Sequence, residues 1–274
     1  MVILPLAPWP ALVSRWQWAE QAGAKHAWTF DHLIWRGAAD QPWLSAIPVL
    51  TGMAVLTSTL RLGTLVSSAN FRDPVPFAKE AVSVDHISGG RLTLGVGAGA
   101  GGFDARQRTV PGRSRTERFA EFVEDLHHLL GPDRATHPAG HMRPGPVQTP
   151  RLPLAIAATR ERGLRLAAQY GDYWLTNGYS PAPGREGPSL SVDEVRRQAS
   201  TLDRLCAEIG RNSVDIRRLL VVGNPVQTRL DDVAVIRRLI DTYAELGFTD
   251  IVLPYPPDDD ERALDVLGSV LSES

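Results

Sequence analysis

The chain has 274 residues, of which 43% are hydrophobic, so it can bury the core of one large α/β barrel or of two ordinary domains. Its 29 basic and 31 acidic residues give a formal net charge of −2, which favours neither nucleic acid nor an anionic membrane surface as a partner. A single cysteine, an N-terminus without the features of a secretory signal, and no apolar run near the roughly 20 residues of a membrane span together predict a cytoplasmic protein.

Short apolar runs alternate with amphipathic segments along the chain. The runs are continuous, which is typical of strands buried on both faces of a parallel sheet. They cover residues 2–6, 26–30, 61–67, 91–96, 152–157, 172–176, 215–222 and 249–253. Helical periodicity covers residues 12–21, 43–57, 116–130, 160–169, 192–209 and 231–246, and a further helix begins at Pro74 and ends at Gly89.

Eight strands with helices between them predict an α/β fold, a (β/α)8 TIM barrel formed by a single domain over residues 1–274. A doubly wound open sheet is the alternative, and the strand count and chain length favour the barrel. Insertions rich in glycine follow the fourth strand (residues 99–115) and the sixth strand (residues 179–188). Loops after strands face the active site of a barrel, so we expect these insertions to wall a pocket.

The most informative stretch is residues 81–101. A helix stops at Gly89-Gly90, a strand follows at once, and the strand opens into the loop Gly97-Ala98-Gly99-Ala100-Gly101. A glycine-rich loop at the carboxyl end of a strand lets a flat or anionic ligand approach the main chain. The loop lacks the spacing of a dinucleotide fingerprint, so we expect a cofactor other than NAD. No pattern of metal ligands and no G-x-S-x-G motif is present.

The second predicted strand ends at Asp31-His32, where both side chains reach the edge at which ligands bind. His32 can donate a hydrogen bond there or move a proton near neutral pH. The alternative interpretation is that Asp31 braces the loop and His32 is a structural group.

Polar groups also follow the third and fifth predicted strands. Ser68 and Asn70 can contact a ligand, and Phe71 is either core or a pocket wall. The fifth strand leads through Ala157-Ala158-Thr159-Arg160 into a helix, where backbone N–H groups, the threonine hydroxyl and one arginine can hold a phosphate. The alternative is an ordinary N-cap made by Thr159.

These motifs together resemble the bacterial luciferase-like oxidoreductases, a family of reduced-flavin monooxygenases and coenzyme F420-dependent enzymes. The resemblance covers most of the chain and weakens after residue 179. It rests on the segments Thr29-Phe-Asp-His32, Leu60-Arg-Leu-Gly-Thr64, Phe71-Arg-Asp-Pro74, Val84-Asp-His-Ile-Ser-Gly-Gly-Arg-Leu-Thr-Leu-Gly-Val-Gly-Ala-Gly99 and the run from Pro150 to Trp174.

The resemblance implies a flavin or deazaflavin bound at the carboxyl end of the barrel, and a homodimer. It implies a non-proline cis peptide near Leu65-Val66, a cofactor phosphate at Ala158-Thr159-Arg160, and His32 beside the reactive ring and the substrate. It assigns the cofactor contacts to Leu65, Val66, Ser67, Ser68, Gly97, Ala98, Gly99, Ala100, Ala157, Ala158, Thr159 and Arg160. The catalytic groups would be His32 and Asp31, and the substrate pocket would be lined by Trp35, Asn70, Phe71, Phe103, Trp174, Asn177 and the loop over residues 179–188.

The chain also departs from one branch of that family. The F420-dependent sugar-phosphate dehydrogenases carry an acidic glutamate after the glycine loop, where this chain has Ala100, and they hold a sugar phosphate with lysines, of which this chain has none after Lys79. A sugar-phosphate substrate is therefore rejected. The first hypothesis is F420-dependent hydride transfer to or from a small organic substrate of apolar or aromatic character. The alternatives are a reduced-FMN monooxygenase and a non-catalytic flavin-binding protein on the same fold.

Overall fold

The computed structural model describes residues 1–35, 40–99, 103–107, 112–181, 188–222, 232–257 and 259–273. A parallel sheet forms its centre, with the strand order β1-β2-β4-β5-β6-β9-β10 and with β3 paired to β4. The strands are β1 (His26–Thr29), β2 (Arg61–Thr64), β3 (Ser67–Ser68), β4 (Leu92–Gly97), β5 (Leu154–Ala157), β6 (Tyr173–Thr176), β9 (Arg217–Val221) and β10 (Asp250–Val252). The predicted parallel α/β arrangement is confirmed.

The predicted first strand is reduced to a single residue, Val2. Val2 forms parallel bridges with Trp28 of β1 and with Pro254, which follows β10, so it links the two ends of the sheet. The predicted strand over residues 61–67 is interrupted: β2 ends at Thr64, and a cis peptide joins Leu65 to Val66 before β3 begins. That cis peptide stands where the family resemblance implied one.

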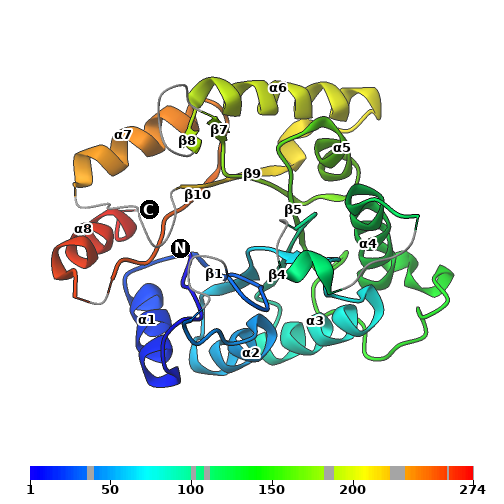
Figure 1. The fold of residues 1–274 in the computed structure, drawn as a ribbon, viewed down its shortest axis with the longest axis horizontal. Helices are drawn as coiled ribbons and strands as arrows, with labels where there is room; N and C mark the ends of the chain where they lie inside the picture. Colours follow the sequence, from blue (N-terminus) through cyan, green and yellow to red (C-terminus); the bar gives the residue numbers. More distant parts are fainter. Residues whose placement is uncertain are drawn as a thin grey trace.

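Helices surround the sheet on its outer side (Figure 1). They are α1 (Trp9–Gln21), α2 (Ala46–Leu56), α3 (Pro74–Ser88), α4 (Arg115–Leu130), α5 (Glu161–Tyr170), α6 (Val192–Glu208), α7 (Val233–Ala244) and α8 (Glu261–Leu271). The last helix is absent from the sequence prediction. Asp260 caps it by accepting a hydrogen bond from Ala263 N, and its apolar residues fall on one face. In the insertion after β6, β7 (Tyr179–Pro181) pairs with β8 (Pro188–Leu190) as an antiparallel ribbon.

Both faces of the sheet are buried, which explains why the strands read as continuous apolar runs. On β5, Leu154 and Ile156 pack into the larger core cluster together with helix residues, whereas Ala155 belongs to a second cluster that also contains Trp28 and Tyr173. Successive side chains of a strand point to opposite faces, so the two clusters lie on opposite faces of the sheet. None of the described helices has the length and apolar character needed to cross a membrane.

The junction between α3 and β4, within residues 81–101, is stabilised by two charged side chains. Asp85 is fully buried at the end of α3 and accepts hydrogen bonds from the backbone of Val147 and from the backbone and side chain of Gln148. Arg91 donates to carbonyl oxygens at the end of α2 and the start of β2, those of Ala54, Thr57 and Leu60. The left-handed Gly89 (φ 65°) ends the helix. This half of the stretch therefore builds the fold and lies away from the candidate site.

The glycine in the middle of β4 is required by the neighbouring strand. A Cβ atom on Gly95 would lie 1.9 Å from the backbone oxygen of Thr64, which cannot move aside without disturbing β2. We therefore expect Gly95→Ala to lower the free energy of unfolding by roughly 1–3 kcal/mol in a denaturant titration. Gly268 in α8 is the matched control, because its added methyl would meet only a Trp18 ring atom at 4.0 Å. Gly268→Ala should raise stability by about 0.5–1 kcal/mol, and a loss of similar size at both positions would contradict the steric argument.

Candidate active site

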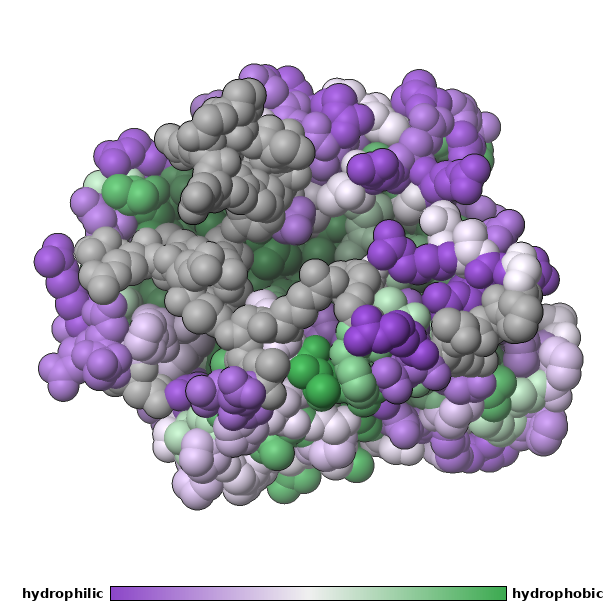
Figure 2. All heavy atoms as spheres, in the orientation of Figure 1, coloured by the Kyte–Doolittle hydropathy of each residue, from purple (hydrophilic) through white to green (hydrophobic). Residues whose placement is uncertain are grey.

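Two adjoining cavities lie at the carboxyl ends of the strands. The larger has a volume of about 610 Å³ and the smaller about 270 Å³, and they share the walls formed by Leu65, Val66 and Ala157. The molecule is hollowed near the middle of the face shown in Figure 2, and hydrophobic side chains are visible in the hollow. The larger cavity is lined by Asp31, His32, Ile34, Trp35, Leu65, Val66, Ser68, Asn70, Gly97, Ala98, Gly99, Phe103, Asp104 and Ala157. The smaller is lined by Phe30, Leu65, Val66, Ala157, Ala158, Thr159, Leu175, Thr176, Asn177 and Val221.

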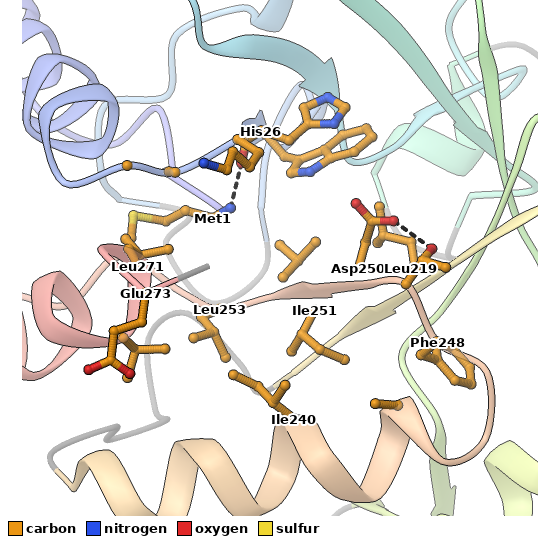
Figure 3. Close-up of a pocket in the computed structure, with 18 of the residues that line it drawn as sticks. Met1, His26, Leu219, Ile240, Phe248, Asp250, Ile251, Leu253, Leu271 and Glu273 are labelled. Atoms are coloured by element: carbon orange, nitrogen blue, oxygen red, sulfur yellow. Dashed lines mark hydrogen bonds between the residues drawn. The ribbon is translucent and has the colours of Figure 1, made fainter.

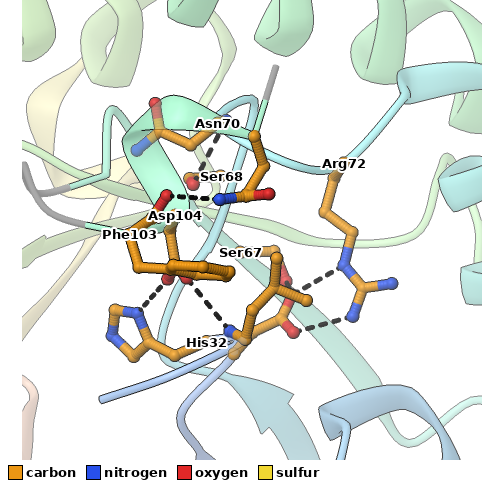
Figure 4. A network of polar contacts seen from close by, with 10 residues as sticks. His32, Ser67, Ser68, Asn70, Arg72, Phe103 and Asp104 are labelled. Carbon is orange, nitrogen blue, oxygen red and sulfur yellow. Dashed lines mark hydrogen bonds and ion pairs between the residues drawn. The ribbon is translucent and has the colours of Figure 1, made fainter. Parts of the chain in front are cut away.

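His32 and Asp104 form a hydrogen-bonded pair in the wall of the larger cavity (Figure 4). Oδ2 of Asp104 lies 2.7 Å from Nδ1 of His32, and Oδ1 accepts a hydrogen bond from the backbone N–H of Leu33 at 3.2 Å. An ionised carboxylate can only accept, so Nδ1 of His32 carries the proton in this pair. In the neutral ring Nε2 then has a free lone pair, which suits it to accept a proton from a ligand in the cavity.

The two partners differ in exposure. The Asp104 side chain is nearly buried, and that of His32 is about one-third exposed (32%). Asp104 begins the short 3-10 helix Asp104–Arg106 inside the insertion after β4, whereas His32 follows β1. The carboxylate therefore fixes the ring from behind while the imidazole keeps access to the cavity.

Asp31 lines the larger cavity, and its carboxylate is bound by Ser67 and Arg72 of the neighbouring segment. Its carboxylate is buried, pairs with the Arg72 guanidinium through both oxygens at 2.7 and 3.0 Å, and also accepts a hydrogen bond from Ser67 Oγ at 2.5 Å. Burial alone would lower the pKa of Arg72, but the hydrogen bonds and charge of Asp31 raise it above its ordinary value. The pair ties the end of β1 to β3, so the brace interpretation of Asp31 fits the geometry and we assign it a positioning role.

The glycine loop packs against the polypeptide that leads into β3 and α3. A Cβ atom on Gly97 would lie 2.6 Å from Cγ2 of Val66, and one on the left-handed Gly99 (φ 70°) would lie 2.2 Å from Nδ2 of Asn70 and 2.8 Å from Ser68 Oγ. Figure 4 shows Ser68 and Asn70 side by side next to Phe103. Because Gly97 and Gly99 have no side chains, the side chains of Val66 and Asn70 fit against the loop. Val66 and Asn70 in turn line the cavity.

The start of α5 has no side-chain cap. Arg160 occupies the N-cap position, and no side-chain hydrogen bond is made there, so the alternative interpretation of Thr159 as an ordinary N-cap is wrong. Thr159 lines the smaller cavity instead. The Trp174 indole donates a hydrogen bond to Ala158 O at 2.9 Å and so fixes the turn from the core side. The uncapped N–H groups at this helix start are suited to an anionic group.

Most of the predicted site residues meet at these two cavities, with four exceptions. Ser67 is fully buried and bonded to Asp31, and Arg160 is exposed on the surface. Phe71 is half-buried under the Arg72 guanidinium, and Trp174 is fully buried in the core beside Phe248, so neither lines the cavities. Ala100 and most of the loop over residues 179–188 lie outside the described residues.

Sequence reasoning missed Asp104 and two aromatic neighbours of the predicted pocket residue Trp35, which are Phe30 and Trp43. Phe30 stacks on Trp35 with ring centroids 4.6 Å apart, and Trp43 contacts Trp35 edge-on at 5.5 Å. Asp104 lies 72 positions from His32 in the sequence, within a segment that carries no periodic pattern. Among the described lining residues of the two cavities no lysine or arginine occurs, and no group of three metal-ligating side chains is found in the described ranges.

The chain is similar in sequence to proteins of one known family. The sequence profile of the luciferase-like monooxygenases matches residues 5–245. A 4-hydroxyprotoasukamycin monooxygenase of Streptomyces nodosus subsp. asukaensis is 34% identical over 206 residues, which are 69% of this chain and 54% of that protein. An F420-dependent hydroxymycolic acid dehydrogenase of Mycobacterium tuberculosis is 30% identical over 176 residues, 60% of this chain and 48% of that one.

The chain spans about half the length of these two relatives. Among solved structures, the coenzyme F420-dependent tetrahydromethanopterin reductase of Methanopyrus kandleri superimposes with a TM-score of 0.73 at 16% identity. That match covers 98% of this chain and 96% of the reductase, so the two share a fold.

Proposed function

Because the chain belongs to the luciferase-like monooxygenase family, we propose that it is an oxidoreductase that transfers hydride between coenzyme F420 and a small organic substrate. The single observation that carries the proposal is the pair of His32 and Asp104 in the wall of the larger cavity. Oxidation of an alcohol to a ketone by hydride transfer releases the hydroxyl proton, which needs an acceptor. The 30% identical relative is named as an F420-dependent dehydrogenase.

The residues present fit a flat ring with a phosphate tail. The larger cavity is lined by the apolar side chains of Leu65, Val66, Trp35 and Phe103, among others, and by the polar side chain of Asn70. The smaller cavity continues past Ala157 to the uncapped start of α5, where backbone N–H groups suit a phosphate. F420 supplies the hydride acceptor or donor when bound there.

The chain's own residues would handle the proton and exclude water. Nε2 of His32 takes the substrate hydroxyl proton in oxidation and returns it in reduction, while Asp104 holds the ring in the required tautomer and orientation. Asp31 keeps the His32 loop against β3 through its pair with Arg72. The apolar walls keep bulk water away from the reacting atoms.

A reduced-FMN-dependent monooxygenase is the second candidate. It is favoured by the 34% identical relative, which is named as a monooxygenase. The same two cavities would hold the flavin, and His32 would again face the substrate. A non-catalytic flavin-binding protein would use the cofactor site but would make no use of the His32–Asp104 pair for proton transfer.

Spectral titration separates the two cofactors. We expect purified protein to bind F420 with a dissociation constant in the micromolar range and FMN at least about tenfold more weakly. Ala157→Leu, which narrows the wall shared by both cavities, should weaken F420 binding, and His32→Ala should leave it unchanged because His32 faces the substrate. Tight FMN binding without F420 binding would replace the first candidate by the second. Cofactor binding with no turnover in a panel of alcohols, ketones and aromatic substrates would favour the non-catalytic role.

We extend the proposal to the complete barrel, the location of the protein and its oligomeric state. The whole chain forms one (β/α)8 barrel domain with insertions after the fourth and sixth strands, and Val2 supplies the closing strand. The protein is a cytoplasmic homodimer. Exposed apolar side chains on α2 and α3, those of Val55, Leu56 and Ile87, offer a surface for the dimer, which analytical ultracentrifugation would test.

A further inference from the structure

Gln198 of α6 is a buried polar residue on a helix face that is otherwise apolar. It is fully buried, and the other buried residues of that helix are Val195, Ala199, Leu202, Leu205 and Cys206. A leucine or methionine of similar size could pack at this position, whereas a buried amide destabilises the fold unless its hydrogen bonds are made. The contacts of the Gln198 amide therefore indicate what the polar group does.

The amide connects the end of β6 to the surface of α6. Its Oε1 accepts a hydrogen bond from the Thr176 hydroxyl at 2.6 Å, and its Nε2 donates to Oε1 of Glu194 at 2.7 Å. The hydrogen bond from Arg197 is the main cause that lowers the pKa of Glu194, so this carboxyl group is ionised at neutral pH. At the other end, the Thr176 hydroxyl accepts from the backbone N–H of Gly178 at 3.0 Å.

The charge of Glu194 fixes the direction of the hydrogen bonds that follow it. An ionised carboxylate can only accept, so the amide of Gln198 turns Nε2 toward Glu194 and Oε1 toward Thr176. Oε1 can also only accept, so the Thr176 hydroxyl donates to it and keeps a lone pair for the N–H of Gly178. The orientation of the Thr176 hydroxyl is therefore set from α6.

The end of β6 and the turn after it form part of the wall of the smaller cavity, through Thr176 and Asn177. Gly178 is left-handed (φ 59°), and a Cβ atom on it would lie 2.3 Å from Cγ2 of Val195, so the turn packs tightly against α6. The oxygen of Gly178 also accepts from the backbone N–H of Ser191 at 3.1 Å. A displacement of Thr176 would therefore move Asn177 and change the shape of the cavity.

We propose that Gln198 is a positioning residue that, through Thr176, holds the turn over residues 176–178 in the shape that binds the cofactor. This inference rests on the proposed function, in which the smaller cavity holds part of the cofactor. Gln198 is fully buried and lines neither cavity of the candidate site, so it acts on the cofactor only through the residues that it contacts.

Titration with F420 and with FMN measures the effect on cofactor binding. Gln198→Leu keeps the size of the side chain and removes both hydrogen bonds, so we expect it to raise the dissociation constant about tenfold. Thr176→Val removes the hydroxyl at the other end of the contact and should weaken binding by a similar factor. The double variant should bind no more weakly than Thr176→Val, whereas losses that multiply would show that Gln198 does not act through Thr176.

Two controls separate positioning from a general loss of stability. Gln148 is a partly buried amide that donates to the buried Asp85 before β4. Ile240 lines a cavity of about 550 Å³ between α7, α8 and β10, at the opposite end of the strands from the candidate site (Figure 3). Gln148→Leu and Ile240→Ala should lower the melting temperature, as Gln198→Leu does, but should leave the dissociation constant within about twofold of the wild-type value.

Amide hydrogen exchange of the cofactor-free protein gives a readout that is independent of the proposed function. Gln198→Leu should speed exchange at Gly178 about tenfold, because the hydroxyl that accepts from its N–H is no longer held, and Gln148→Leu should leave this exchange unchanged. Unchanged exchange in Gln198→Leu, or faster exchange with an unchanged dissociation constant, overturns the inference.

Failure of the proposed function has a different signature. A wild-type protein that binds neither F420 nor FMN overturns the proposed function and, with it, the role of Gln198 in cofactor binding. The exchange measurement on the same protein then still decides whether Gln198 holds the turn over residues 176–178.

Discussion

Asp104→Asn is expected to lower kcat about a hundredfold or more while KM and the dissociation constant of the cofactor stay within about twofold of the wild-type values. The carboxylate of Asp104 accepts from Nδ1 of His32 at 2.7 Å and so leaves Nε2 free to take a proton. An asparagine of the same shape can present its N–H₂ group to Nδ1, which favours the tautomer with the proton on Nε2 and removes the base. Steady-state kinetics with the substrate found in the screen, together with cofactor titration, measure both effects.

The matched control lies on the same short helix. Arg106 is exposed and makes no contact with the cavity, so Arg106→Gln should keep the wild-type kcat. His32→Ala should lose at least as much activity as Asp104→Asn, and the double variant should be no slower than His32→Ala because the carboxylate acts through the ring. Additive losses in the double variant would show that Asp104 acts on the substrate independently of His32.

Arg72→Met is expected to lower the free energy of unfolding by about 3–5 kcal/mol in a urea or guanidinium titration. The side chains of Asp31 and Arg72 are 1% and 16% exposed, and their atoms lie 2.7 Å apart. Removing the guanidinium leaves the Asp31 carboxylate buried, with the Ser67 hydroxyl as its remaining partner among the described residues. The desolvation cost of that carboxylate is then no longer offset by an opposite charge.

A surface ion pair supplies the comparison. Arg196 and Asp193 on α6 are 56% and 92% exposed, and Arg196→Met should change stability by no more than about 1 kcal/mol. Replacing both buried partners, as in Asp31→Leu with Arg72→Met, should recover part of the loss because no unpaired charge remains. Equal losses for Arg72→Met and Arg196→Met would contradict the view that burial of the first pair sets its energetic role.

The fold was predictable because its signals are local. Continuous apolar runs marked the strands, and Pro74 and Gly89 marked the ends of α3, since each signal depends on residues within a few positions. The interruption at Leu65–Val66 could not be read from periodicity, because both residues at the break are apolar, as strand residues are. It was anticipated only through the family resemblance.

The candidate site was predictable in part. Residues that directly follow strands, such as His32 and Asn70, could be placed at the ligand-binding edge from the strand pattern alone. The partner of His32 could not, since Asp104 belongs to an irregular insertion and meets His32 only through tertiary structure. Ala100 stands where one branch of the family has a glutamate, and Asp104, four positions later in the sequence, supplies a carboxylate beside His32 that was not predicted. Trp174 was misassigned because both faces of β6 are buried, and its position on a strand did not reveal which face it occupies.

The contacts of Asp85 and Arg91 bear on how relatives of this chain should be recognised. Both belong to the segment by which the chain is most readily identified, and both serve to join α2, α3 and the turn before β5 rather than to contact a ligand. A homologue that kept this segment but replaced His32 or Asp104 would still fold and still be assigned to the same group by sequence matching. Genome surveys that seek active members should therefore score the histidine and the distant aspartate directly.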